Sequence, residues 1–482
     1  RSDHWVFQRP RKLPDHLQKV YKIGTGKKEE VLKQQECLKE LLSDQLSEGI
    51  FVGHLLAGET SLEQVPISIP GEYMAHHLGI FGRTGTGKSN NLMVLIDSIY
   101  RNNRRLFGRT PEDWGPAERP VSLFAIDPHD EFAKWKGGRE SGIVRIMRDM
   151  TADERKALVE PFFYLSCRSQ EHLDQDPDLG GLGRTVYFSR KDIIPQDIIS
   201  IMEVSEQMAS AAEAIADEFG EDWIEAILNG DVEPDERVIH RATLSALNRR
   251  LGFLATGRSN LVPRSETYHS RLPDIVLALE QGRVLDVDTT LVTEVEQFLL
   301  TTVVARTIFS MRKALKAALE PGDLADEFQR YLQLMKSFRD EFTKTFCDPG
   351  SPYIREDGSL KSIGELPAVN VVVEEAPSIL NPARLKFGSI FREIARQGRK
   401  FGIGLTIVSQ QITEIDPTIL SQLNTEITLA LGNEDERQAA VRTASNDIWG
   451  FKRELQVLGL GQAILTASYK DIPLPIQIPE FG

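Results

Sequence analysis

The sequence predicts an α/β fold in which helices cover a mainly parallel β-sheet, with a helical insertion and a short N-terminal region. The first observation behind this prediction is an apolar run, Leu78 to Phe81, that leads directly into the glycine-rich motif Gly82–Ser89 and then into an amphipathic segment. The second is a series of short apolar runs that end in polar side chains, as buried parallel strands do where they meet a ligand crevice. The third is the helical spacing of apolar positions in the long segments between these runs.

The composition is that of a globular protein, with 41% hydrophobic and 27% charged residues among 482. A formal net charge of −14 argues against a protein whose whole surface coats nucleic acid, although a local basic lining is compatible with it. Cys37, Cys167 and Cys347 lie far apart, so neither a zinc site nor a disulfide framework is predicted. No apolar run approaches the ~18 to 20 residues of a membrane span and no signal peptide is visible, so we expect a cytoplasmic protein without a membrane partner.

Residues 1–64 form the N-terminal region ahead of the predicted core. Leucine spacing predicts a helix from Glu29 to Gln45, and Ile50–Val52 and Val65–Ile69 are typical of short strands. The first residue is Arg1 rather than Met, which suggests that the natural start lies upstream.

The motif GRTGTGKS matches the phosphate-binding loop GxxxxGK[ST], with the strand before it and the helix after it that the motif requires. Glycines let backbone N–H groups curl around a polyphosphate, and the helix start adds partial positive charge. We expect Lys88 to reach the β and γ phosphates of ATP and the Ser89 hydroxyl to hold Mg²⁺. A chance glycine-rich turn is disfavoured because both flanks are correct. The predicted nucleotide-binding residues are Gly82, Thr84, Gly85, Thr86, Gly87, Lys88, Ser89 and Asn90.

A strand predicted at Val121–Ile126 ends in the polar sequence DPHDEF, residues 127–132. One interpretation places Asp127 and His129 on the nucleotide side of the sheet, where the carboxyl ends of parallel strands lie. The other is an ordinary turn closed by Asp and Pro. The residues alone favour neither.

The region from about Asp192 to Glu341 is mostly helical in pattern. A strand predicted at Gly282–Asp288 returns from it to the sheet, and no Gly, Pro or Ser-rich linker separates it from either side. We therefore expect a helical insertion, residues 191–279 and 291–364, in a core made of residues 65–190, 280–290 and 365–475. The helices predicted by apolar spacing are Ile194–Ala216, Glu221–Leu228, Val238–Leu251 and Val295–Ala318.

The apolar run Val369–Glu375 reads VNVVVEE and predicts a buried strand that ends in two adjacent carboxylates. In enzymes with a phosphate-binding loop, the first acid assists Mg²⁺ through its water shell and a second can orient the attacking water. We assign Glu374 to the metal, in part through water, and Glu375 to the water. The alternative is a strand followed by a solvated acidic helix start, which the presence of the glycine-rich motif disfavours.

Three arginines follow in the segment Ile390–Phe401, where Arg392, Arg396 and Arg399 share one side of a predicted helix. Their mutual repulsion suggests an anionic partner, either the γ-phosphate of a nucleotide on an adjacent subunit or a nucleic-acid phosphate. The competing interpretation is a solvated cationic helix end.

The next predicted strand, Gly404–Ser409, ends in Gln410, whose amide is a candidate for sensing the γ-phosphate or holding the attacking water. Ile427–Leu431 and Ala463–Ala467 predict further strands of the same sheet. Alternating prolines in Pro473–Pro479 argue against a central strand, so we expect residues 473–482 to form an extended tail over the surface or across to a neighbour.

The blocks HLGIFGRTGTGKSNN, DPHDEF, EEAP and ARQGRKFGIGLTIVSQQITEIDPTILSQLNT, in this order between residues 65 and 475, resemble the HerA family of the HerA/FtsK class of P-loop ATPases. The resemblance implies a RecA-like core with a helical insertion. It also implies a homo-oligomer, a hexameric ring that threads double-stranded DNA and moves it by hydrolysing ATP with Mg²⁺.

Roles carried over by the resemblance fall on matching positions only. Lys88 and Ser89 match the first nucleotide motif, Glu374 and Glu375 the second, and Gln410 the sensor position, while Arg396 and Arg399 lie where the family has an arginine that acts on the neighbouring subunit. Arg399 is preferred. The catalytic set is therefore Lys88, Glu375, Gln410, Arg396 and Arg399. Two departures are Pro377, where a histidine is common, and an N-terminal β-barrel that is short or absent.

Two functions from different classes are compatible with these features. The first is an ATP-driven DNA motor that works with a partner, either a nuclease in DNA-end processing or a nuclease or sirtuin-like, NAD-consuming effector in antiviral defence. The acidic charge and short N-terminal region favour the defence setting. The second is a scaffold ring that assembles and gates such an effector. Transport of RNA or protein in place of DNA also remains open.

Overall fold

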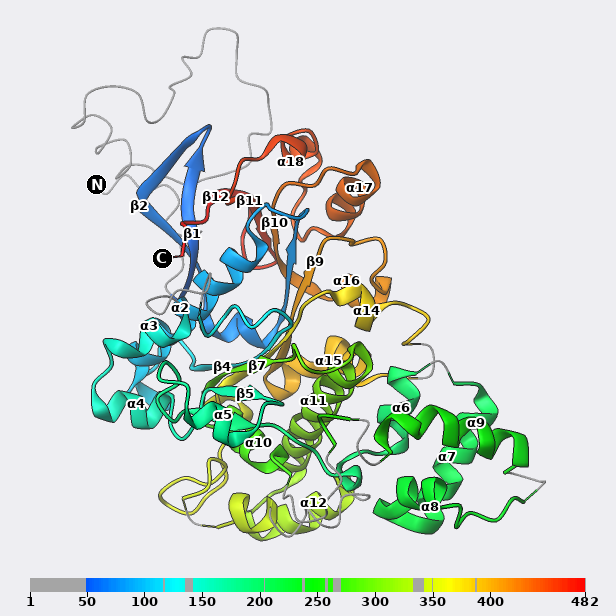
Figure 1. Ribbon diagram of the computed structural model, residues 1–482. Helices are drawn as coiled ribbons and strands as arrows, with labels where there is room; N and C mark the ends of the chain where they lie inside the picture. Colours follow the sequence, from blue (N-terminus) through cyan, green and yellow to red (C-terminus); the bar gives the residue numbers. More distant parts are fainter. Residues whose placement is uncertain are drawn as a thin grey trace, which may run out of the picture.

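The computed structural model describes residues 49–115, 118–134, 142–202, 204–235, 239–255, 259–262, 270–332, 342–348, 350–385 and 388–481. Its centre is one mixed sheet with helices on both faces, and a group of helices projects to one side (Figure 1). The helix expected at residues 29–45 lies outside the described residues. Within them, no helix combines the length and the apolar character that a membrane crossing requires.

A sheet of 12 strands runs through the molecule in the order β2-β1-β12-β11-β10-β3-β9-β8-β4-β7-β5-β6. The eight strands from β10 to β6 pair in parallel, and β11, β12, β1 and β2 extend the sheet with antiparallel pairs. The strands are β1 (Ile50–Ala57), β2 (Thr60–Ile69), β3 (His77–Phe81), β4 (Val121–Asp127), β5 (Tyr164–Ser166), β6 (Gly183–Thr185), β7 (Val284–Asp288), β8 (Ala368–Val373), β9 (Ile403–Ser409), β10 (Leu423–Thr428), β11 (Gln462–Ala467) and β12 (Leu474–Gln477).

Helices cover both faces of the sheet because its central strands are apolar on both sides. Of the two large hydrophobic clusters, one includes residues of α2, α3 and α4, and the other includes residues of α10, α11 and α15. The helices are α2 (Lys88–Leu106), α3 (Ile143–Arg148), α4 (Ala152–Leu158), α5 (Gln170–Asp174), α6 (Pro195–Ile201), α7 (Glu206–Phe219), α8 (Trp223–Asn229), α9 (Arg241–Leu251), α10 (Leu272–Glu280), α11 (Glu294–Ala317), α12 (Leu324–Tyr331), α14 (Ala376–Leu380), α15 (Ile390–Gln397), α16 (Pro417–Leu420), α17 (Glu434–Thr443) and α18 (Glu454–Val457).

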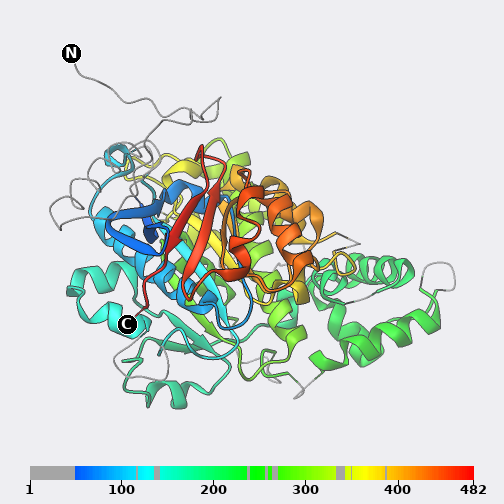
Figure 2. The same ribbon diagram turned by 90° about the horizontal axis from the view of Figure 1, so that it is seen from above.

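The predicted helical insertion is present, and its outer helices α7, α8 and α9 project from the sheet in both views (Figures 1 and 2). The single helix expected at Ile194–Ala216 is two helices, α6 and α7. The insertion nevertheless shares its core with the sheet, because Trp223 of α8 and Phe124 of β4 belong to the same hydrophobic cluster.

The observed architecture confirms the predicted α/β fold with a mainly parallel sheet. The strands expected around residues 78–81, 121–126, 282–288, 404–409 and 463–467 are present as β3, β4, β7, β9 and β11. The strand expected at Ile427–Leu431 begins earlier, at Leu423. The short strands β5 and β6, which extend the parallel edge, were not predicted.

The expectation that Pro473–Pro479 avoids a central strand is wrong, because β12 pairs with β11 on one side and with β1 on the other. The sheet tolerates Pro475 because that residue pairs only with Ile464 of β11, whereas the pairing with β1 begins one residue later, at Ile476. The missing N–H of proline therefore interrupts no ladder on the β1 side.

Candidate active site

The glycine-rich loop connects β3 to α2 and is held by backbone hydrogen bonds on both sides. Gly82 N–H donates to Ser409 O at 3.2 Å and Arg83 N–H to Ala430 O at 2.9 Å, so the loop continues the parallel ladder before it turns. Gly87 has φ of +105°, in the region that favours glycine, and it immediately precedes the first residue of α2. The loop is thus shaped by the strands beside it.

Lys88 lies at the centre of a cleft of about 580 Å³ that opens beside this loop. Its Nζ donates to Gly82 O at 2.9 Å and to Arg83 O at 3.2 Å. Burial lowers the pKa of Lys88, and the negative charges of Glu374 and Glu375 oppose that shift. The ammonium group therefore lies between its own loop and the two predicted carboxylates.

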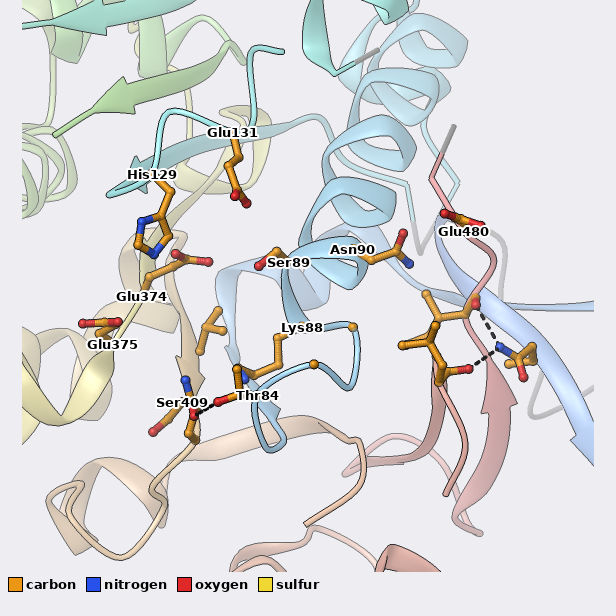
Figure 3. Close-up of a pocket in the computed structure, with 18 residues that line it drawn as sticks. Thr84, Lys88, Ser89, Asn90, His129, Glu131, Glu374, Glu375, Ser409 and Glu480 are labelled. Carbon is orange, nitrogen blue, oxygen red and sulfur yellow. Dashed lines mark hydrogen bonds between the residues drawn. The ribbon is translucent and has the colours of Figure 1, made fainter. Parts of the chain in front are cut away.

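Glu374 and Glu375 follow the last residue of β8, and both line the cleft. Burial, together with the charges of Asp127 and Glu375, raises the pKa of Glu374 to about 8, while Lys88 acts in the opposite direction. Glu375 is exposed and has φ of +46°, and the chain turns there into α14. Figure 3 shows the Glu374 carboxylate turned toward Ser89, with Glu375 farther out at the same end of the cleft.

Pro377, one of the two departures noted in the sequence, lies in the first turn of α14. Proline fits this position because the first N–H groups of a helix have no partner within the helix. The residue therefore helps to begin α14 directly after the two carboxylates.

Gln410 follows β9 and joins the loop to the neighbouring strand. Thr84 Oγ1 donates to Gln410 Oε1 at 2.6 Å. The structure thus brings the predicted residues Thr84, Gly85, Gly87, Lys88, Ser89, Asn90, Glu374, Glu375 and Gln410 to one cleft.

Three predicted binding residues have contacts that differ from a simple phosphate cradle. Thr86 is buried and its hydroxyl donates to Arg83 O at 2.7 Å, so it shapes the loop. A Cβ at Gly82 would lie 2.8 Å from the Thr86 hydroxyl, which explains a glycine there. Asn90 lines the cleft, but its amide is hydrogen-bonded to Pro479 and Phe481.

The turn after β4 combines the two interpretations that the sequence left open. The Asp127 carboxylate closes the turn by accepting from His129 N–H at 3.1 Å and Phe132 N–H at 2.7 Å. Burial raises the pKa of Asp127 to about 6, although these hydrogen bonds oppose the shift. His129 and Glu131, carried by the same turn, line the cleft (Figure 3). Neither was among the predicted site residues.

The arginine segment lies away from the cleft of its own chain. It occupies α15 and the 3-10 turn Gly398–Phe401, which ends two residues before the first residue of β9, whereas the cleft lies beyond the last residue of that strand. After burial, the charge of Arg399 contributes to lowering the pKa of His76 to about 4, and His76 directly precedes β3. The end of the sheet near Arg399 is therefore separated from the glycine-rich loop by the length of β3, which is five residues, or about 17 Å at strand spacing.

The three arginines also differ in their partners. Arg392 is bound within the chain to Asp416 Oδ2 at 2.7 Å. Arg396 and Arg399 are exposed, and no ion pair is found for either among the residues that the structure describes. The turn that carries Arg399 is anchored by the buried Arg312, which donates to Phe401 O and Gly402 O and pairs with Glu280 at 2.8 Å.

The oxygen donors at the cleft fit Mg²⁺ held jointly by protein and phosphate. The Ser89 hydroxyl and the Glu374 carboxylate are hard ligands of the kind that this ion prefers. Within the described ranges, no group of three or more His, Cys, Asp or Glu is arranged to hold a metal by itself. An ion that keeps several waters and binds one or two side chains plus phosphate needs no such group.

Comparison with known proteins gives consistent matches. The family model described as "Helicase HerA, central domain" matches residues 50–306, which is more than half of the chain. The DNA double-strand break repair helicase HerA of Pyrococcus furiosus is 22% identical over 453 residues, covering 90% of this chain and 70% of that protein. A probable helicase of Methanocaldococcus jannaschii is 22% identical over 419 residues, covering 85% of this chain and 67% of that protein.

Among solved structures, the bacterial conjugative coupling protein TrwB superposes with a TM-score of 0.50 at 12% identity. The superposition covers 93% of this chain and 94% of that one. At this identity the match shows the fold, which is that of a RecA-like P-loop ATPase core.

Proposed function

Because the chain belongs to the HerA helicase family and is a P-loop ATPase, we propose that it is a ring-forming motor that translocates double-stranded DNA by hydrolysing ATP. The single observation that carries the proposal is the assembly of Lys88, Ser89, Glu374 and Gln410 at one cleft from segments up to 322 residues apart in sequence. The same residue types at the ends of neighbouring parallel strands are what phosphoryl transfer requires.

In the proposed reaction, Lys88 exchanges its loop carbonyls for the β and γ phosphates and neutralises the charge that develops on them. Ser89 and Glu374 would hold Mg²⁺, which supplies Lewis-acid stabilisation of the phosphate charge when it is bound. Glu375 orients the attacking water from the outer end of the cleft. Gln410, held by Thr84, is positioned to respond to the γ-phosphate.

A second copy of the chain completes the site in this proposal. Arg399, or Arg396 in its place, lies near the end of the strands that is opposite to the cleft of the same chain. It therefore cannot reach a nucleotide in that cleft without a large rearrangement. A head-to-tail interface would place it at the neighbour's γ-phosphate, and such an interface closes into a ring when its rotation allows. We propose six subunits, as the resemblance implies.

Subunit mixing tests this proposal directly. Lys88→Ala should abolish hydrolysis, and Arg399→Ala should lower it by about a thousandfold. A mixture of the two inactive variants should regain activity, because some interfaces then join an intact loop to an intact arginine. Lys400→Ala, a change of the exposed neighbour in the same turn, is the matched control and should remain active. A mixture that stays inactive although mixed rings form would contradict action across subunits.

The partner is proposed to be an effector protein, a nuclease or a sirtuin-like, NAD-consuming enzyme, in DNA-end processing or antiviral defence. A Glu375→Gln variant separates the motor from the scaffold alternative. If the assembly stays intact but effector activity is lost, the motor is supported. Retained effector activity without hydrolysis would favour a scaffold ring.

A further inference from the structure

The cleft has a second flank that the proposed hydrolysis does not use. The strand order places β9, β8 and β4 on one side of the P-loop strand β3, and β10, β11 and β12 on the other. Glu374, Glu375 and Gln410 come from the first side, whereas Leu460, Gly461, Gln477 and Ile478 line the cleft from the second. If the γ-phosphate of a bound ATP meets the carboxylates and Gln410, as the proposed function requires, its nucleoside would extend toward the second flank.

The second flank is built by a segment that we call the strap, residues Gln477–Phe481. The strap is fastened to the first turn of α2 by Asn90, whose Nδ2 donates to Pro479 O at 2.8 Å and whose Oδ1 accepts from Phe481 N–H at 2.8 Å. These reciprocal bonds occupy both ends of the Asn90 amide. Asn90 therefore positions the strap next to the residues that would bind phosphate.

The turn before β11 joins the strap to the P-loop. Gly461 N–H donates to Thr86 O at 3.2 Å, and Ile478 N–H donates to Gly461 O at 2.8 Å. Gln477 Nε2 donates to Leu460 O at 3.2 Å and to Ile478 O at 3.1 Å. The turn, the strap and the P-loop are thus one connected wall.

Leu460 gives this wall an apolar surface. Leu460 is 75% exposed although it borders the cleft, while Ile478, which also lines the cleft, is buried. A flat heterocyclic base can bury such a leucine, whereas inorganic phosphate gains nothing from it.

We propose that Leu460 and the strap form the nucleoside-binding wall of the ATP site, with Asn90 as a positioning residue. The inference rests on the proposed function, because it assumes that the cleft binds a nucleoside triphosphate. It goes beyond that function by assigning base contact to a segment about 390 residues away from the P-loop in sequence.

The test compares two probes, ATP and inorganic tripolyphosphate, by calorimetric titration of the full chain with Mg²⁺ present. Leu460→Ser should raise the Kd for ATP by about fivefold to tenfold, the equivalent of exposing a leucine-sized apolar contact. The Kd for tripolyphosphate should not change. Val457→Ser is the matched control, since Val457 is 77% exposed on the neighbouring α18 and does not border the cleft. It should leave both constants unchanged.

Asn90→Ala provides a second variant, which loosens the strap without replacing any residue of the wall. It should again weaken ATP binding and leave tripolyphosphate binding intact, a difference that general destabilisation of the P-loop would not produce. Equal effects on the two probes, or no effect of Leu460→Ser on ATP, would overturn the inference. Lys88→Ala should weaken both probes, and if it weakens neither, the proposed function fails instead.

Discussion

Glu426 is a carboxyl group enclosed in the middle of the sheet. It lies on β10 opposite Gly79 of the P-loop strand, its side chain is fully buried, and Thr443 donates to its Oε2 at 3.1 Å. No hydrogen-bond partner is found for its Oε1 among the described residues. Burial raises its pKa from the ordinary 4.5 to about 8, and Thr443 only partly opposes this. The Glu426 carboxyl group of the native protein therefore stays protonated at neutral pH.

This proton makes stability depend on pH. The unfolded chain releases it near pH 4.5 but the native state releases it only near pH 8, so between these values the native state binds more protons and the free energy of unfolding falls as the pH rises. Glu426→Gln, which is always neutral, should remove this decline of about 4 kcal/mol. Urea unfolding at pH 5, 7 and 9 measures the effect. Parallel pH profiles for the variant and the natural chain would contradict it.

The residues of the site were predictable to different degrees for physical reasons. Lys88 and Glu374 belong to short local patterns that phosphate and metal binding require, so the sequence alone predicted that they lie at one site, and both line the cleft. His129 lies in a stretch that was recognised, yet a turn and a ligand site look alike there. Leu460 and the strap carry no local pattern, because only the order of strands brings them to the cleft.

At the scale of elements, α15 and the 3-10 turn after it contain one arginine that is paired within the chain, Arg392, and two that are exposed, Arg396 and Arg399. Its apolar side, which includes Phe391 and Ile394, is buried as the spacing predicted. Arg392 is held by Asp416, which is almost fully buried. Burial tends to raise the pKa of Asp416, but the hydrogen bond and charge of Arg392 and the hydrogen bonds of Thr418 together outweigh it, so that the pKa is lowered. The expectation of an anionic partner outside the chain therefore concerns Arg396 and Arg399, because Arg392 has its partner within the chain.

Substitutions of Arg392 on α15 and of Arg399 in the following turn should have opposite effects on stability and on hydrolysis. Arg392→Ala leaves a buried carboxylate without its cation and should cost about 1 to 3 kcal/mol of stability, while hydrolysis at a temperature where the variant is folded is retained. Arg399→Ala should change stability by less than about 0.5 kcal/mol and lose hydrolysis. Urea unfolding and ATPase rates on the same samples measure both. Loss of activity in Arg392→Ala with intact folding would show that the assignment is reversed.

Strand β12 shows where element prediction fails. A rule on proline in central strands is correct for a residue paired on both sides, but Pro475 is paired on one side only. That offset depends on where β1 begins its pairing, and β1 lies about 400 residues earlier in the chain. Local sequence carries no information about such a partner.

At the scale of the whole molecule, the net charge of −14 restricts how the proposed motor could hold DNA. Favourable contacts must come from a local group of basic side chains, and an assembled ring could gather such groups in its channel. Contacts of this kind are made to phosphates, which are the same at every base pair.

DNA stimulation of hydrolysis should therefore depend on salt and not on sequence. The duplex concentration for half-maximal stimulation should rise by at least ~100-fold between 50 and 200 mM NaCl, because several counterions are released on binding. Duplexes of unrelated sequence should behave alike, and the rate without DNA should change little. ATPase titrations with two duplexes at both salt concentrations decide this. A strong preference for one sequence would contradict phosphate binding.

The place of β12 between β11 and β1 has a consequence during protein synthesis. The hairpin of β1 and β2 leaves the ribosome first, but the strand that joins β1 to the sheet is made about 400 residues later. At 5 to 20 residues per second this interval lasts roughly 20 to 80 s. Throughout that time β1 presents an unpaired edge to other nascent chains, and the P-loop cannot yet acquire its strap. A chain released early would thus carry the phosphate-binding motif without the finished pocket.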